Sequence, residues 1–388
     1  MKIVFYDYVF DPALPGKSGL SDVVWDMAQG FARLGHEVHI VGPYPSSDIA
    51  LDGVKIHRQT ISSWSMRNAF TQALMIYNAA LYIKNHIKNV DVIHVPEYYS
   101  AAILTLILNT PVILTTPGHI HERIKSGYNG FDPFFTVVLK VAVIIASKRC
   151  ARVIAISNEM KQYWISTGVK ENKINVIPYG IDVPMFCEEK DLKHLLPEWW
   201  DNTRKNIVFV GRLSREKGID LLIQAYANLL KTHTDLQLHI FGSGDETTYT
   251  KLAQTLNVSS NIKFHGWVQK SHIPAIYRYS YASIVPSYSE PLGRVVLEAM
   301  ASNTAVIGSR VGGIPDFIRH HETGLLFEKG NLEDLTHQLE WLIMHPHERN
   351  ALAAAGADLV CQNFSWDLVC AKIDQLVHTS VRERTRME

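Results

Sequence analysis

The sequence has no excess of charge of either sign. Its 388 residues include 38 Lys and Arg and 38 Asp and Glu, which gives a formal net charge of zero. A chain without net charge has no general electrostatic attraction for nucleic acid. We therefore expect no nucleic-acid partner, and any site for an anion has to be built locally.

Cysteine is also scarce, with single residues at 150, 187, 361 and 370. None belongs to a CxxC pair, and no His stands at zinc-ligand spacing from them. These absences argue against a disulfide framework and against a structural metal, and they favour a reducing, cytoplasmic location. The opening residues MKIVFYDYVF lack a small-residue cleavage site, so we interpret them as a buried strand and not as a signal peptide.

Long hydrophobic runs are missing too. The longest apolar stretch, residues 131–146, is interrupted by Asp132 and Lys140 and is shorter than the roughly 18 to 20 residues that span a bilayer. We predict a buried helix. The alternative is a peripheral contact of the N-terminal domain with the inner face of a membrane, because the basic residues Lys148, Arg149 and Arg152 follow and suit anionic lipid.

Short Val- and Ile-rich runs alternate with helical patterns along the whole chain, which is typical of parallel strands covered on both faces. The length suits two domains. A polar stretch after residue 182 separates two such series, and we place the domains at 1–185 and 186–365. The predicted strands are 3–5, 37–41, 90–95, 111–115, 152–156 and 173–177 in the first domain, and 207–210, 236–241, 262–264, 282–285 and 305–308 in the second.

Three segments carry residues suited to phosphate or sugar chemistry. The first is PGKSG, in which Gly16, Ser18 and Gly19 precede a helix whose apolar face is Val24, Met27, Ala28, Phe31 and Leu34. Backbone N–H groups at a helix start, with glycines that permit close approach, suit a diphosphate. The alternative is a plain glycine turn.

The second segment is VGRLSREKGID, with Arg212 and Lys217 after the strand 207–210. Two cations at the carboxyl end of a strand are placed to neutralise a leaving diphosphate, although a solvated basic loop is the alternative. The third is SEPLGRVVLEAM, with Glu290 in a loop and Glu298 about two turns along a helix. The amides after Glu290 would meet a sugar or phosphate, and Glu298 would accept from a ribose diol. Two solvated carboxylates are the alternative there.

Together these segments resemble glycosyltransferase family four, whose members share the GT-B fold of two facing Rossmann-like domains. The most specific part is SEPLGRVVLEAMASNTAVIGSRVGGIPDFI followed by HETGLLF, with GRLSREKG before it. The resemblance covers nearly the whole chain. It implies a retaining, metal-independent transfer from a nucleotide diphosphate sugar with no cofactor, and a C-terminal helix, 366–388, that crosses back to the N-terminal domain. The apolar stripe of that segment is Trp366, Leu368, Val369, Ile373, Leu376 and Val377.

The resemblance also implies roles for single residues. Arg212 and Lys217 would bind the diphosphate, Glu290 and residues Pro291, Leu292 and Gly293 the hexose, and Glu298 the ribose. Val268 would lie beside the base, and Gly16 to Gly19 would close over the phosphates. Arg294 would touch phosphate or a charged acceptor, or form a salt bridge. An acceptor-side His is expected after the strand 111–115, where His119 is favoured over His121.

The donor base and sugar and the acceptor stay open at this stage. UDP- and GDP-linked hexoses would use the same phosphate and ribose contacts. The acceptor would be a sugar, a lipid or a small molecule, in polysaccharide or glycoconjugate synthesis. Two rival functions are a catalytically silent subunit that binds nucleotide sugar, and a GT-B epimerase or phosphorylase. The presence of both cations and both glutamates favours the transferase.

Overall fold

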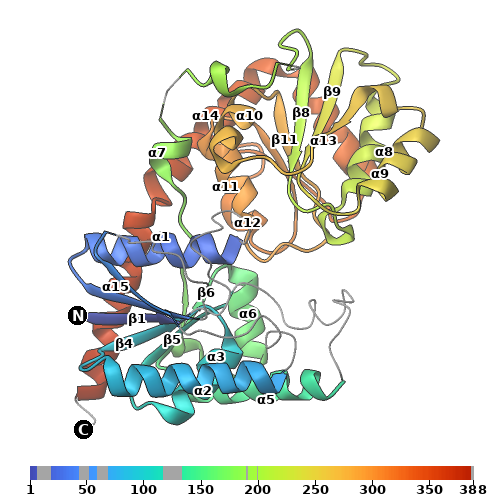
Figure 1. Ribbon diagram of the computed structural model, residues 1–388. Helices are drawn as coiled ribbons and strands as arrows, with labels where there is room; N and C mark the ends of the chain where they lie inside the picture. The colour runs from blue at the N-terminus through green and yellow to red at the C-terminus, as the bar shows by residue number, and fades with distance from the viewer. Residues whose placement is uncertain are drawn as a thin grey trace. The chain divides into compact units, whose positions relative to one another are not determined.

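The computed structural model describes residues 1–6, 19–42, 52–58, 69–116, 133–188, 191–198 and 200–385. The chain forms two compact units (Figure 1): the first comprises Met1–Tyr179 and Trp366–Glu388, and the second Gly180–Ser365. The predicted boundary at residue 185 falls within helix α7 (Val183–Phe186), which is part of the second unit. The last helix, α15 (Trp366–Thr385), packs against α1 (Gly19–Arg33) within the first unit.

The first unit is built on a sheet of seven parallel strands in the order β3-β2-β1-β4-β5-β6-β7. Its strands are β1 (Lys2–Tyr6), β2 (Glu37–Gly42), β3 (Val54–Arg58), β4 (Val92–Val95), β5 (Val112–Thr116), β6 (Arg152–Ala155) and β7 (Ile174–Val176). The intervening helices are α1, α2 (Ala69–His86), α3 (Tyr98–Ile107), α5 (Pro133–Arg149) and α6 (Asn158–Ser166). Every residue of β4 and β5 is buried, as expected when helices cover both faces of a parallel sheet.

The second unit repeats this plan with six parallel strands in the order β10-β9-β8-β11-β12-β13. They are β8 (Lys205–Val210), β9 (Leu236–Phe241), β10 (Ile262–Phe264), β11 (Ala282–Val285), β12 (Val306–Ser309) and β13 (Leu325–Phe327). Its helices are α7, α8 (Ile219–Leu229), α9 (Glu246–Thr255), α10 (Ile273–Arg278), α11 (Arg294–Ala301), α12 (Ile314–Phe317), α13 (Leu332–Met344) and α14 (Pro346–Asn363). The predicted pair of doubly wound α/β domains is therefore confirmed.

Two apolar stripes predicted from the sequence each contain one residue that the structure exposes. On α1, Val24, Met27, Ala28 and Phe31 are buried, but Leu34 is exposed because the helix ends at Arg33. On α15 the stripe is buried except for Leu368. Helical spacing identified the buried faces correctly and included one position too many in each.

The apolar stretch predicted as a buried helix is α5, and that prediction is only partly right. Ala142, Val143 and Ala146 are buried, whereas Val137, Val141 and Ile144 are exposed on the other side of the helix. None of the described helices has the length and apolar character required to cross a bilayer.

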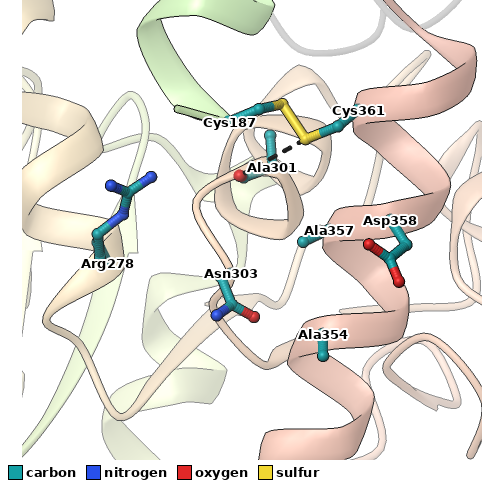
Figure 2. A pocket seen from close by; sticks show the side chains of 8 residues that line it. All are labelled: Cys187, Arg278, Ala301, Asn303, Ala354, Ala357, Asp358 and Cys361. Atoms are coloured by element: carbon teal, nitrogen blue, oxygen red, sulfur yellow. Dashed lines mark hydrogen bonds between the residues drawn. A yellow bond between two sulfur atoms is a disulfide. The ribbon is translucent and has the colours of Figure 1, made fainter. Parts of the chain in front are cut away.

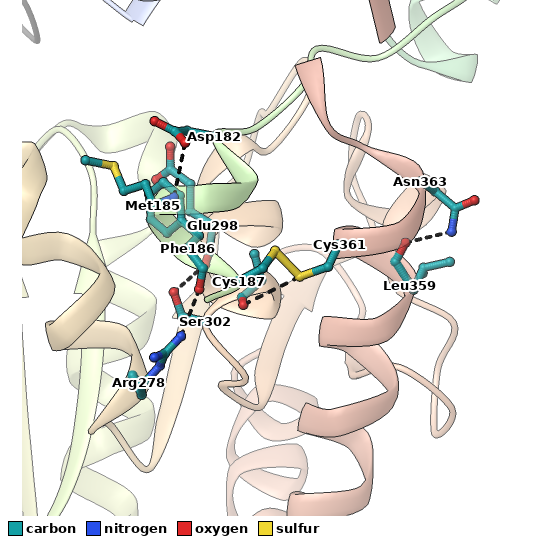
Figure 3. Close-up of a disulfide and its surroundings, with 11 residues drawn as sticks. Asp182, Met185, Phe186, Cys187, Arg278, Glu298, Ser302, Leu359, Cys361 and Asn363 are labelled. Carbon is teal, nitrogen blue, oxygen red and sulfur yellow. Dashed lines mark hydrogen bonds between the residues drawn. A yellow bond between two sulfur atoms is a disulfide. The ribbon is translucent and has the colours of Figure 1, made fainter. Parts of the chain in front are cut away.

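The prediction that the cysteines form no disulfide is wrong for one pair. Cys187 and Cys361 are joined by a disulfide, 174 positions apart (Figure 3). Cys150 and Cys370 are buried free thiols. The bond ties the residue after α7 to the last turn of α14, close to the two ends of the second unit. No local sequence motif indicated this disulfide, because only the fold brings the two cysteines together.

Candidate functional site

The candidate site begins where two neighbouring strands of the second unit end. Strands β8 and β11 are parallel and adjacent, so the loops that follow them leave the sheet at the same edge. The loop after β8 carries Arg212 and leads into a short 3-10 helix, η4 (Arg215–Lys217). The loop after β11 carries Glu290 and leads into α11. Both sequence motifs thus arise from one edge of one sheet.

Backbone contacts hold these two loops together. The N–H groups of Tyr288 and Ser289 donate to the carbonyl oxygen of Glu216, at 2.8 and 3.3 Å. Gly218 lies so near the other loop that a Cβ built there would overlap the carbonyl oxygen of Pro286, and its φ of +66° is a left-handed conformation. Only glycine meets both conditions, which explains its place directly after Lys217.

The two loops meet through an ion pair. The Nζ of Lys217 donates to Oε2 of Glu290 at 2.6 Å, and the side chains are 18% and 11% exposed. Such a charge-assisted hydrogen bond, largely shielded from water, is stronger than an exposed one. The structure therefore brings together one predicted phosphate-binding cation and one predicted hexose-binding carboxylate.

The second cation, Arg212, is paired by a residue that the sequence analysis did not assign. Its Nη2 donates to Oε1 of Glu216 at 3.1 Å, and its side chain is largely exposed. Although burial alone would raise the pKa of Glu216, the neighbouring polar groups and the charges of Arg212 and Lys217 hold that pKa below its usual value. Glu216 lies inside the GRLSREKG motif, so its position four residues after Arg212 was the available signal.

A tight turn leads from Glu290 into α11. Gly293 precedes the helix with a φ of +93°, and Leu292 is buried beneath the turn. The N–H of Gly313, in the loop after β12, donates to the carbonyl oxygen of Glu290 at 3.1 Å. Residues Pro291 to Gly293 are thus fixed by a third strand-end loop, and the helix start that follows carries partial positive charge.

One turn into α11 the structure places the second predicted glutamate. Glu298 lies 3.6 Å from Nη2 of Arg294, which realises the salt bridge foreseen for that arginine. Burial and the charge of Glu298 raise the pKa of the Tyr277 hydroxyl well above its ordinary value, so the phenol stays neutral beside the carboxylate. The Glu298 side chain is mostly buried, at 15% exposed.

The remaining predicted residues belong to other parts of the chain. Val268 lies in the loop after β10, and β9 separates that strand from β8 in the sheet. Gly19 is the first residue of α1 in the first unit. Gly16, Ser18, His119 and His121 lie outside the described residues.

A pocket of about 620 Å³ lies elsewhere in the second unit, at the other end of α11 (Figure 2). Ala301, Arg278, Asp358 and the Cys187–Cys361 disulfide are among its lining residues. A helix of eight residues is about 12 Å long. The pocket is therefore separate from the Lys217–Glu290 pair, which lies near the start of the helix.

Comparison with known proteins identifies the family. Residues 17–184 match the family described as Glycosyltransferase Family 4, and residues 197–359 match Glycosyl transferases group 1. The chain belongs to glycosyltransferase family 4. An uncharacterized glycosyltransferase from Methanocaldococcus jannaschii is 28% identical over 387 residues, with 95% of each chain covered.

Solved structures agree on the fold of this family 4 member. The sucrose-phosphate synthase from Thermosynechococcus elongatus matches with a TM-score of 0.81 and 22% identity over 97% of this chain and 98% of that chain. The Anabaena HepE structure in complex with UDP and glucose matches with a TM-score of 0.77 and 19% identity over 98% and 100%. The predicted GT-B fold is confirmed, and the chain is a glycosyltransferase.

Proposed function

We propose that the chain is a retaining, metal-independent hexosyltransferase that uses a UDP- or GDP-linked sugar. The acceptor is a sugar, a lipid or a small molecule, in the synthesis of a polysaccharide or glycoconjugate. The observation that carries this proposal is the Lys217–Glu290 ion pair beside the start of α11. It joins a group that binds phosphate to a group that binds sugar hydroxyls, as a nucleotide sugar requires.

Two cations serve the diphosphate in this proposal. Lys217 and Arg212 neutralise the negative charge that grows on the leaving diphosphate, which is the work a divalent metal does in other transferases. Each cation is already held by a carboxylate, Glu290 or Glu216. The cations are thus positioned before the donor binds, and little reorganisation is needed during the reaction.

The proposed chemistry takes place on one face of the donor sugar. The bond between the anomeric carbon and the diphosphate oxygen breaks, and both electrons leave with the diphosphate. The acceptor hydroxyl oxygen bonds to the anomeric carbon from the same side, and its proton passes to the departing phosphate oxygen. In this mechanism Glu290 binds hydroxyl groups and is not a covalent nucleophile, because the acceptor oxygen itself bonds to the anomeric carbon.

Other contacts in this proposal rest on the family resemblance. Glu298 holds the ribose, Val268 borders the base, and His119 or His121 faces the acceptor. Gly16, Ser18 and Gly19 close over the phosphates. The UDP and glucose named for the Anabaena structure support a UDP-linked hexose as the first donor to try.

A thermal-shift screen tests donor binding directly. Purified protein is heated with UDP, GDP or ADP in the presence of EDTA, because a ligand that binds only the folded state raises the melting temperature. We expect one nucleotide to raise it, and Lys217→Ala to lose that increase. Lys231→Ala is the matched control, since Lys231 lies past the far end of α8 and is exposed.

A rise that appears only with added divalent metal would contradict metal independence, and no rise with any nucleotide would contradict the donor class. Retention is tested separately on the product. The donor for this test is the diphosphate-linked hexose of the nucleotide that stabilises the protein. Proton NMR of the first product then gives the anomeric configuration of the new glycosidic bond. The same configuration as in the donor is expected, and the opposite one would rule out the front-face mechanism.

A further inference from the structure

Most of the large exposed apolar side chains described in the first unit lie on three neighbouring helices. Helices α2, α3 and α5 lie side by side on one face of the seven-stranded sheet, and α3 contacts both of the others (Figure 1). Ten large hydrophobic side chains are exposed among the described residues, and six of them are on these helices, each at least 46% exposed. The six are Leu74, Tyr77, Leu106, Val137, Val141 and Ile144.

The same helices carry charge of one sign only. They are 18, 10 and 17 residues long, and their sequences contain no Asp or Glu. They contain four basic residues, Lys84, Lys140, Lys148 and Arg149, all exposed. Among the described residues, no carboxylate pairs with any of the three lysines. Protein surfaces ordinarily mix both signs, and this chain as a whole has equal numbers of each, so the bias is local.

On α5 the apolar and basic side chains share one side of the helix. Val137, Lys140, Val141, Ile144 and Lys148 follow one another at spacings that keep them on a single stripe, and all five are exposed. The opposite side of α5 is buried in the unit. Lysines beside an apolar stripe can bury their methylene stems and direct their ammonium groups to lipid phosphates.

We propose that this face of the first unit, formed by α2, α3 and α5, docks on the surface of an anionic lipid bilayer. The exposed apolar side chains enter the headgroup region, and the lysines meet the lipid phosphates. Since none of the described helices can cross a bilayer, the contact is peripheral. The proposal does not depend on the donor or on catalysis.

A second copy of the chain is a poorer occupant of the α2–α3–α5 face. In a two-fold dimer the same face would meet itself, so lysines would approach lysines. The three helices offer no carboxylate to compensate them. Like charges brought together across an interface oppose association, whereas an anionic bilayer satisfies the apolar and the basic side chains at once.

Vesicle flotation tests the proposal without any nucleotide. The full chain is mixed with vesicles of phosphatidylcholine and phosphatidylglycerol, or of phosphatidylcholine alone, at low and high salt. We expect binding to the anionic vesicles, weaker binding at high salt, and little binding to the neutral ones. Lys140→Glu/Lys148→Glu should lower partitioning by about thirtyfold or more, since each lysine near an anionic surface contributes about 1 kcal/mol.

Val141→Asp/Ile144→Asp tests the apolar part and should also abolish most binding. Matched controls are Lys372→Glu, exposed on α15, and Met344→Asp, exposed on α13 of the second unit. Both controls should bind as the unaltered chain does, and melting temperatures verify that every variant is folded.

Failure of the unaltered chain to float with anionic vesicles overturns the proposal, as does unchanged binding by either double variant. Sedimentation analysis measures the oligomeric state and so tests whether a second copy occupies the face. A dimer that dissociates in the Val141→Asp/Ile144→Asp variant would assign the face to a second copy. Because the flotation assay contains no nucleotide and the thermal-shift screen contains no lipid, the two proposals fail independently.

Discussion

The Nζ of Lys217 lies 2.6 Å from Oε2 of Glu290, although 73 positions separate the two residues. Both side chains are mostly buried. Removing one partner of such a pair leaves the other charge uncompensated, and this lowers stability as well as function. Variants of this pair therefore need a design that separates the two effects.

Lys217→Ala should reduce kcat/KM at least a hundredfold, because a preorganised charge in a shielded site contributes about 2.7 to 4 kcal/mol to the transition state. It should also lower the melting temperature by leaving Glu290 unpaired. The double variant Lys217→Ala/Glu290→Gln removes the unpaired charge, so its stability should recover while its activity stays low. Turnover of Lys217→Ala at the unaltered rate would contradict the proposed mechanism.

The close approach of the two loops can be tested at Gly218. Gly218→Ala adds a Cβ that overlaps the carbonyl oxygen of Pro286 and strains a backbone with φ +66°. Gly266 is a matched control in the same unit, with φ +65° and nothing within 4 Å of the added Cβ. Gly266→Ala should cost about 1 kcal/mol of stability from backbone strain alone. Gly218→Ala should cost more, and equal melting temperatures for the two would show that the loops can separate freely.

Much of the fold could be predicted from the sequence because buried parallel strands appear as continuous Val and Ile runs. Two strands escaped notice. β3 reads Val-Lys-Ile-His-Arg and lies at the edge of its sheet, where half-exposed positions accept polar side chains. β13 is the Leu-Leu-Phe of the HETGLLF segment, which the sequence analysis used only as part of the family resemblance and did not interpret as a strand. Hydrophobic patterning reflects burial, so it fails at strands such as β3 where burial is partial.

The sequence predicted which residues belong to the candidate site, but it did not predict which of them contact each other. Lys217 and Glu290 were predicted as site residues from their charge and from the motifs around them. Their ion pair could not be predicted, because it depends on β8 and β11 being neighbours in the sheet. The pairing of Arg212 with Glu216 depends on how η4 turns, and the Cys187–Cys361 bond depends on the whole second unit. Long-range pairings of this kind leave no local pattern in the chain.

The disulfide should stabilise the second unit. A bond across 174 residues restricts the unfolded chain, and losing it is expected to cost about 2 to 4 kcal/mol. The melting temperature should therefore fall when a reducing agent is added. Cys187→Ser/Cys361→Ser should already melt at the lower temperature, and the reducing agent should not change it further.

Thiol counting provides the check on that pairing. Burial raises the pKa of Cys150 and of Cys370 to about 12, so these free thiols stay protonated and unreactive in the folded chain. Unfolding without a reducing agent should expose two thiols, and unfolding after reduction four. Four reactive thiols before reduction would show that Cys187 and Cys361 are not joined.

Stability should decrease as the pH falls below about 6.5, because several histidines are buried in the strands, His94 and His239 among them. Burial lowers the pKa of His94, in β4, to about 3, and burial together with His265 and Lys263 lowers that of His239, in β9, to about 3. In the unfolded chain an imidazole has a pKa of about 6.5. Between these values the unfolded state binds one more proton per histidine than the folded state, so acid favours unfolding.

As the pH falls from 6.5 to 5, where most carboxylates are still ionised, the slope from each of these histidines should rise toward about 1.4 kcal/mol per pH unit. Urea unfolding at several pH values measures it, with His94 reporting on the first unit and His239 on the second. His239→Gln should remove one such contribution from the transition of the second unit. His347→Gln, at an exposed position on α14, is the matched control. An unaltered slope for His239→Gln would mean that His239 takes up its proton without unfolding, and that the core around β9 admits charge.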